Sequence, residues 1–111
     1  FIYSVLQGLN CRVKKNIAGT GLTAEFGEGR TVIIRADMDA LPIREDSRKP
    51  YASQCDGVMH ACGHDVHMSC ALGAALLLSE SPPENGCVRI LFQPAEEAVD
   101  SEGKGGACRV I

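Results

Sequence analysis

Blocks of hydrophobic and polar residues predict helices and strands along the whole chain. The opening segment has apolar residues at the i, i+3, i+4, i+7 spacing of an amphipathic helix, namely Ile2, Val5, Leu6 and Leu9. Residues 11–17 and 22–26 are typical of strands, and residues 31–36 are rich in β-branched side chains. Because a glycine-containing turn separates the last two segments, we expect them to form a hairpin.

The second half of the chain predicts a helix followed by a strand. Residues 65–79 form the helix, and five of its apolar side chains can face a core: Val66, Ala71, Ala74, Ala75 and Leu78. Residues 87–92 form the strand. This strand and residues 32–34 are continuous apolar runs, which are typical of strands buried on both faces of a sheet. The order strand, helix, strand predicts an α/β fold with a mixed, partly parallel sheet flanked by helices.

Composition narrows the class of partner. The 111 residues carry a net charge of −3, and 45% of them are hydrophobic. Basic and acidic residues are interspersed, so the basic stripe that nucleic acid or an anionic membrane requires is missing. The longest nearly apolar run, residues 70–78, is too short to cross a bilayer. We therefore expect a small molecule or a peptide as the partner, with no nucleic acid and no membrane.

Both ends of the sequence predict that it is part of a longer domain. The chain begins at Phe1, already inside the pattern of an amphipathic helix. It stops at Ile111, where a new apolar segment begins. We therefore expect residues 1–111 to be one portion of a domain, truncated at both ends.

Six cysteines leave two interpretations open. They are compatible with a secreted domain held together by disulfides, or with free thiols in a reducing compartment. Cys70 lies in an apolar helical run and Cys87 begins an apolar strand, where free cysteine behaves as a small hydrophobic residue. The second interpretation therefore fits better, and it predicts a cytoplasmic protein.

Potential metal ligands gather in residues 60–67, which contain all three histidines of the chain. Cys62 and His64 flank Gly63, which allows the backbone to bend tightly between them. The start of a helix also offers amide dipoles that favour a thiolate. Two residues cannot complete a tetrahedral zinc site. The pair alone is therefore compatible with a core or surface position, with catalysis, or with a structural zinc site completed by His60 or His67.

Acidic residues follow both apolar strands. Glu96 and Glu97 come after the second strand, and adjacent carboxylates there point in different directions. One can bind a cation while the other takes a proton from water, although a solvated acidic turn is the alternative. Asp37 and Asp39 follow the first strand, at the edge where α/β sheets bind ligands. They are compatible with a turn in which Arg35 is the ion-pair partner, or with a supporting role beside a metal ion.

Three segments taken together resemble the characteristic motifs of the M20 metallopeptidase family. They are residues 35–43 (RADMDALPI), 59–67 (MHACGHDVH) and 92–97 (FQPAEE). The similarity is strongest to the amidohydrolase branch, which acts on N-acyl amino acids, and it covers nearly the whole chain. It implies a zinc-peptidase-like catalytic domain of which residues 1–111 are the N-terminal portion. It also implies hydrolysis of an amide bond by a water that two divalent metal ions activate, and a homodimeric or homo-oligomeric enzyme.

The resemblance implies a role for each candidate residue. Cys62, His64 and Glu97 match the family's metal ligands, which suit zinc, manganese or cobalt. Glu96 matches the general base, and Asp39 matches the acid that orients the site. Two further metal-binding histidines and a dimerisation domain are expected outside these residues, so we expect this chain alone to be inactive. A non-catalytic module with a structural zinc site is the alternative.

Overall fold

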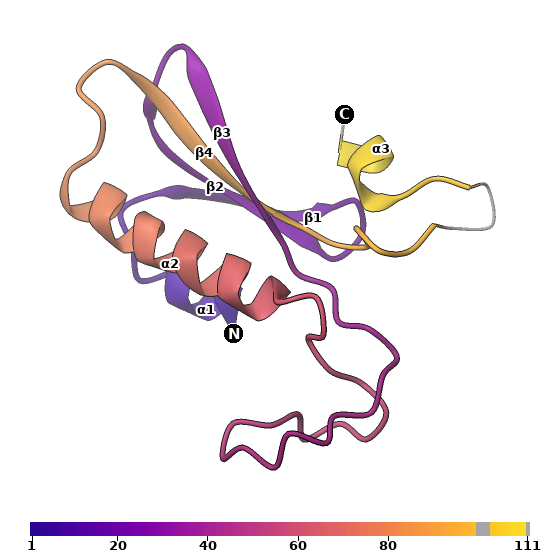
Figure 1. The fold of residues 1–111 in the computed structure, drawn as a ribbon. Coiled ribbons are helices and arrows are strands. Elements are labelled where there is room, and N and C mark those ends of the chain that lie inside the picture. Colours follow the sequence, from indigo (N-terminus) through magenta and orange to yellow (C-terminus); the bar gives the residue numbers. More distant parts are fainter. Residues whose placement is uncertain (100–102, 111) are drawn as a thin grey trace.

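One mixed four-stranded sheet organises the computed structural model, which describes residues 1–99 and 103–110 (Figure 1). The strand order is β1-β2-β4-β3. The pairs β1–β2 and β2–β4 are antiparallel, whereas β3–β4 is parallel and is connected through helix α2. The strands are β1 (Arg12–Ile17), β2 (Gly21–Glu28), β3 (Thr31–Asp37) and β4 (Gly86–Gln93), and the helices are α1 (Ile2–Leu6), α2 (His64–Glu80) and α3 (Gly106–Val110). The predicted α/β class with a partly parallel sheet is confirmed.

The predicted hairpin between residues 22–26 and 31–36 is wrong, because β4 lies between these strands. Phe92 on β4 is opposite Leu22 on β2 and also opposite Ala36 on β3. The hairpin partner of β2 is β1. A turn in the sequence shows that the chain reverses, but it does not show whether a later strand will insert between the two that precede it.

Helix α2 packs against one face of the sheet and closes the core (Figure 1). Ala71 and Ala75 of α2 are buried, as predicted, against Ala24, Phe26, Ile90 and Phe92 of the sheet, among other residues. Small side chains at these two positions let the helix approach the strands closely. The prediction for Val66 is wrong, because its side chain is exposed. At about 100° per residue, five positions place Val66 and Ala71 on different sides of the helix.

No helix in residues 1–99 and 103–110 combines the length and the apolar character that crossing a bilayer requires.

A cluster of charges covers the sheet face that points away from α2. Glu25 accepts a hydrogen bond from Nε of Arg89 at 2.8 Å, and Arg12 and Lys14 lie within ion-pair distance. Burial raises the pKa of Glu25, but the Arg89 hydrogen bond and the three cations outweigh it, so the pKa is lowered. The carboxylate thus stabilises the fold above the pKa of unfolded glutamate, and this stabilisation is lost as the pH falls through the lowered pKa of Glu25.

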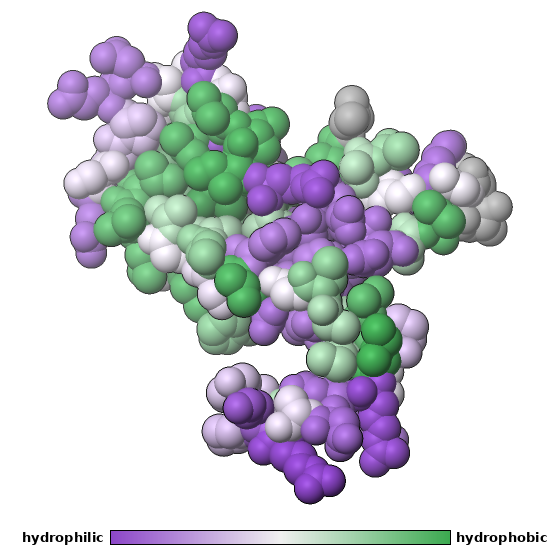
Figure 2. All heavy atoms as spheres, in the orientation of Figure 1, coloured by the Kyte–Doolittle hydropathy of each residue, from purple (hydrophilic) through white to green (hydrophobic). Residues whose placement is uncertain are grey.

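Strand β3 differs from the prediction that it is buried on both faces. Val32, Ile33 and Ile34 are 65%, 56% and 39% exposed, because β3 is an edge strand and α2 covers only its carboxyl end, around Ala36 and Asp37. Figure 2 shows hydrophobic surface over the part of the sheet where β3 begins. The opposite edge strand, β1, carries several basic side chains, which discourage pairing with another chain. Strand β3 lacks this protection along residues 31–34.

A long arm, residues 38–63, leaves the sheet after β3 and returns to the start of α2 (Figure 1). Its far end is mostly hydrophilic (Figure 2). Two backbone hydrogen bonds close its base, from Leu41 N to Met59 O at 2.9 Å and from Met59 N to Leu41 O at 3.1 Å. This bridge holds the segment after β3 close to the segment before α2, and both segments carry candidate site residues.

We predict that the 111-residue chain produced alone self-associates through the β3 edge. Val32→Lys should shift it towards the monomer, because a charge on an exposed edge strand opposes pairing. Analytical ultracentrifugation would measure the association state. Val99→Lys is the matched control, since Val99 is similarly exposed at 69% but lies outside the sheet, and it should have no effect. A wild-type chain that sediments as a monomer would contradict the prediction.

Candidate metal centre

Three chain segments meet at the carboxyl ends of β3 and β4. The parallel pairing of these strands brings their ends to the same edge of the sheet, and Met38 N donates to Gln93 O at 2.8 Å just beyond β3. Asp39 therefore lies beside the glutamates that follow β4. The first turn of α2 supplies the third segment, because His64 contacts Asp39. The structure thus brings together the predicted site residues Asp39, Cys62, His64 and Glu97.

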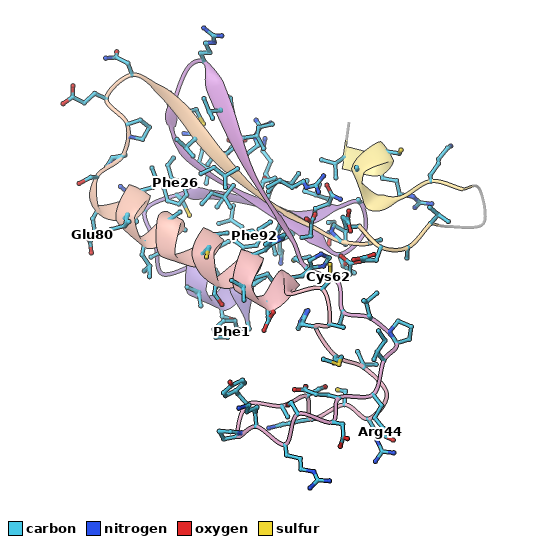
Figure 3. All side chains as sticks on the ribbon, in the orientation of Figure 1. Phe1, Phe26, Arg44, Cys62, Glu80 and Phe92 are labelled. Atoms are coloured by element: carbon cyan, nitrogen blue, oxygen red, sulfur yellow. The ribbon has the colours of Figure 1, made fainter. Side chains whose placement is uncertain are left out.

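Cys62, His64 and Glu97 form one group of potential metal ligands. One donor atom from each residue lies within 4.8 Å of the others. His64 is buried, whereas Cys62 and Glu97 are exposed, so the group is open to solvent on one side. Figure 3 shows Cys62 where the arm meets α2. A thiol, an imidazole and a carboxylate at this spacing are a donor set that suits a divalent transition metal ion.

Asp39 connects the three segments through its own polar atoms. Its Oδ2 accepts a hydrogen bond from the backbone N–H of Glu97 at 2.9 Å, and its Oδ1 lies 3.4 Å from Nδ1 of His64. Burial raises the pKa of Asp39, but the backbone N–H groups of Glu97 and Glu96 outweigh it, with a smaller contribution from His64. The pKa of Asp39 is therefore lowered, and the carboxylate stays ionised beside the ligand group.

The contacts of His64 decide which ring nitrogen is available to a metal ion. Its Nδ1 lies 3.0 Å from the backbone carbonyl oxygen of Asp39. Because a carbonyl oxygen only accepts hydrogen bonds, this contact requires a proton on Nδ1. The neutral ring then carries its lone pair on Nε2, and a hydrogen bond from the other nitrogen to a carbonyl is typical of metal-binding histidines.

Two glycines permit the backbone geometry of the site. Gly63, between Cys62 and His64, has a φ of 81° and forms the N-cap of α2, which confirms the tight bend expected there. Gly106 packs against the turn that precedes the glutamates, where its N–H donates to the Ala95 carbonyl oxygen at 2.8 Å. A Cβ on Gly106 would lie 1.8 Å from the carbonyl oxygen of Pro94. Any side chain at this position would displace the turn that carries Glu97.

The electrostatic environment of Cys62 differs from the prediction. The start of α2 was expected to favour the thiolate, yet the pKa of Cys62 is raised. The hydrogen bond with Glu97 is the largest cause, and the negative charges of Glu97, Glu96 and Asp39 add to it. Without a cation in the site, nearby carboxylates outweigh the helix dipole, and the thiol holds its proton.

Glu96 lies next to this group without belonging to it. Its carboxylate is exposed and is close enough to raise the pKa of Cys62, but it is not among the donor atoms that gather around His64. Of the two adjacent glutamates, only Glu97 contributes a donor atom to the group. This arrangement leaves the Glu96 carboxylate available for proton transfer.

The sequence interpretation missed a second group of potential ligands, formed by Asp37, His64 and His67. The His67 ring stacks on the His64 ring at 5.4 Å, and its Nδ1 lies 3.6 Å from Oδ2 of Asp37. Arg35 also donates to Oδ2 of Asp37 at 3.2 Å, so the predicted ion pair is present. Asp37 thus supports the stacked pair of rings, whereas Asp39 contacts the ligand group directly. Neither group of potential ligands in the described residues includes His60.

The model for peptidase family M20/M25/M40 matches residues 33–111. The chain belongs to this family. Its match covers all three motifs and every candidate residue of the site. Helix α2, strand β4 and the ligand group therefore lie in the part of the chain that the family model matches, whereas β1 and β2 precede it.

Relatives of this M20 chain are considerably longer. It is 44% identical to an N-acetyl-L-cysteine deacetylase of Bacillus subtilis, covering 100% of this chain and 26% of the relative. It is 51% identical to thermostable carboxypeptidase 2 of Saccharolobus solfataricus, and the alignment covers 84% of this chain and 25% of the relative. A crystal structure from Bacillus subtilis, described as a dinuclear metal-binding peptidase of the M20 family, superposes with a TM-score of 0.79 at 44% identity. The superposition covers 86% of this chain and 28% of that structure. The chain thus spans about a quarter of the length of the proteins it matches.

We predict that Glu97→Gln accelerates alkylation of Cys62 in the metal-free, full-length protein. Removing the carboxylate lowers the pKa of the thiol, so more thiolate is present at pH 7. A fall of one pKa unit would raise the thiolate fraction roughly tenfold, so an increase of about threefold or more is expected. Peptide mass spectrometry after timed iodoacetamide treatment would measure the rate. Glu84→Gln, at an exposed glutamate beyond the far end of α2, is the control and should leave the rate unchanged.

Proposed function

We propose that the full-length protein hydrolyses the amide bond of an N-acyl amino acid or a small peptide, using a water activated by divalent metal ions. The observation that carries the proposal is the open group of Cys62, His64 and Glu97 with the Glu96 carboxylate beside it. The relatives named as a deacetylase and a carboxypeptidase support this reaction class. The neighbour described as dinuclear supports two ions, for which zinc, manganese and cobalt are the candidates.

Residues of this chain fit the ligand roles that the proposal gives them. The Nδ1 contact to the Asp39 carbonyl directs Nε2 of His64 away from Asp39 and leaves its lone pair free. A cation would offset the negative charges of Glu97, Glu96 and Asp39, which help to raise the pKa of Cys62 by disfavouring its thiolate. Divalent ions held there would supply a Lewis acid, which polarises a carbonyl group and lowers the pKa of water. Further ligands are expected outside these residues, since the relatives are considerably longer.

Glu96 is proposed as the general base. It accepts a proton from the attacking water while the water oxygen bonds to the amide carbon. As the carbon–nitrogen bond breaks, Glu96 passes this proton to the leaving amine. Asp39 holds the His64 ring and the Glu97 backbone in position during both steps. A proton transfer of this kind contributes typically about 10² to 10⁴ in rate.

A structural zinc module agrees less well with the geometry. Structural zinc sites are closed by four protein ligands, usually cysteine and histidine. Here the group includes Glu97, and both Glu97 and Cys62 are exposed to solvent. An exposed side of this kind leaves room for water and substrate.

We predict that substitutions at the two glutamates separate the base from the ligand in the full-length protein. Glu96→Gln should keep the bound metal but lose about 10²-fold or more in kcat, the usual contribution of a general base. Glu97→Gln should lose metal, because an amide is a weaker ligand than a carboxylate. Metal content by mass spectrometry and turnover of an N-acetyl amino acid would measure the two effects. Equal loss of metal in both variants would contradict the assignment.

We also predict that Cys62→Ser weakens metal binding by about tenfold or more, and zinc binding more than manganese binding. Replacing a soft thiolate with a hard, neutral hydroxyl penalises the softer ion most. Competition with a chromogenic chelator would give both affinities. Cys55→Ser is the matched control, since Cys55 is also an exposed free cysteine. Unchanged affinity in Cys62→Ser would show that the sulfur is not a ligand.

A further inference from the structure

A pocket of about 510 Å³ lies beside the candidate metal centre. This volume is within the range of roughly 300–1,000 Å³ that is typical of small-molecule sites. Asp39 and Glu97 belong to its lining and also to the candidate metal centre, so the two share a boundary. The other lining residues are mainly apolar and include Met38, Ala40, Leu41, Pro42, Pro94 and Ala98.

The charges of the pocket distinguish between the two parts of an N-acyl amino acid. Its lining contains the carboxylates Asp39 and Glu97 and no cationic side chain, as far as the described residues show. A substrate carboxylate placed there would be desolvated among mainly apolar walls, with no cationic side chain among the described lining residues to pair with it. An uncharged hydrocarbon chain would instead exchange water for the apolar walls. The pocket therefore favours the acyl group over the amino acid's carboxylate.

Backbone hydrogen bonds hold the walls of the pocket in place. The bridge between Leu41 and Met59 fixes the wall that belongs to the arm. The hydrogen bond from Gly106 N to Ala95 O, at 2.8 Å, fixes the turn after β4. A pocket with fixed walls loses little entropy when it is filled, and it discriminates between ligands by size.

We propose that this pocket, which we call the acyl pocket, binds the uncharged aliphatic acyl group of the substrate. The inference rests on the proposed function, because it places the amide carbon next to Cys62, His64 and Glu97. An acyl chain bonded to that carbon can then extend between Leu41 and Pro94. Substrates with a longer unbranched chain are preferred until the pocket is full, and acyl groups that end in a carboxylate are rejected.

A series of N-acyl glycines tests the preference in the full-length, metal-loaded protein. From acetyl through butanoyl to hexanoyl, kcat/KM should rise by about fourfold for each added methylene that is buried. N-succinyl glycine should be hydrolysed at least about tenfold less efficiently than N-pentanoyl glycine, which has a similar length and no terminal charge. A flat series, or equal use of the succinyl substrate, would overturn the proposal.

Substitution of one wall residue tests the location of the pocket. Ala40→Leu fills space in the acyl pocket, so it should reduce the ratio of hexanoyl to acetyl kcat/KM by about tenfold or more. Ala52→Leu is the matched control, because Ala52 lies on the same arm but does not line the pocket, and it should leave this ratio unchanged. An unchanged ratio in Ala40→Leu, or an equal decrease in both variants, would overturn the assignment to this pocket.

Binding to the metal-free protein separates failure of the pocket from failure of the proposed reaction. Isothermal titration calorimetry should give a lower Kd for N-hexanoyl glycine than for N-acetyl glycine, and Ala40→Leu should remove this difference. If no substrate is hydrolysed but the difference is present, then the proposed function is wrong and the pocket assignment stands. If hydrolysis occurs but neither Kd nor kcat/KM depends on the acyl chain, then the pocket assignment is wrong.

Discussion

The hydrogen bond from the Glu97 backbone to Asp39, together with the contact between Asp39 and His64, joins the parts of the site. Glu97 follows β4, Asp39 follows β3, and His64 begins α2, so one carboxyl group connects three segments that are distant in sequence. The hydrogen bonds that this carboxylate accepts from backbone N–H groups keep the pKa of Asp39 low. The position of the ligand group therefore depends on an ionised, partly buried carboxylate.

The sheet makes these contacts possible, because β3 and β4 are parallel neighbours. Their carboxyl ends lie at the same edge, and α2 connects them by crossing the face that carries Phe92 and Ile90. The bridge at the base of the arm and the close approach of Gly106 then fix the segments beyond the strand ends. Apolar packing and backbone hydrogen bonds thus compensate for the cost of placing several acidic groups together.

That concentration of acidic groups also explains why the site favours a cation. Asp39, Glu96 and Glu97 together raise the pKa of Cys62, so the thiol is protonated when no positive charge is nearby. A divalent ion would reverse this effect by stabilising the thiolate and the carboxylates at once. In the acyl pocket, the apolar walls favour hydrocarbon, and the described lining residues offer no cationic side chain to pair with an anionic group.

Local sequence determined the elements and the chemistry of this protein. Periodicity located α2 and β4 to within a few residues, and the motifs around Asp39, Cys62 and Glu97 identified the residues that the fold brings together, because each signal lies within a short segment. Tertiary structure alone decided the strand order, since insertion of β4 beside β3 depends on pairing between residues more than 50 positions apart. It also decided the exposure of Val32, the raised pKa of Cys62 and the stacking of His67 on His64. Each of these depends on which segments are neighbours in space, and hydrophobic pattern and residue spacing do not contain that information.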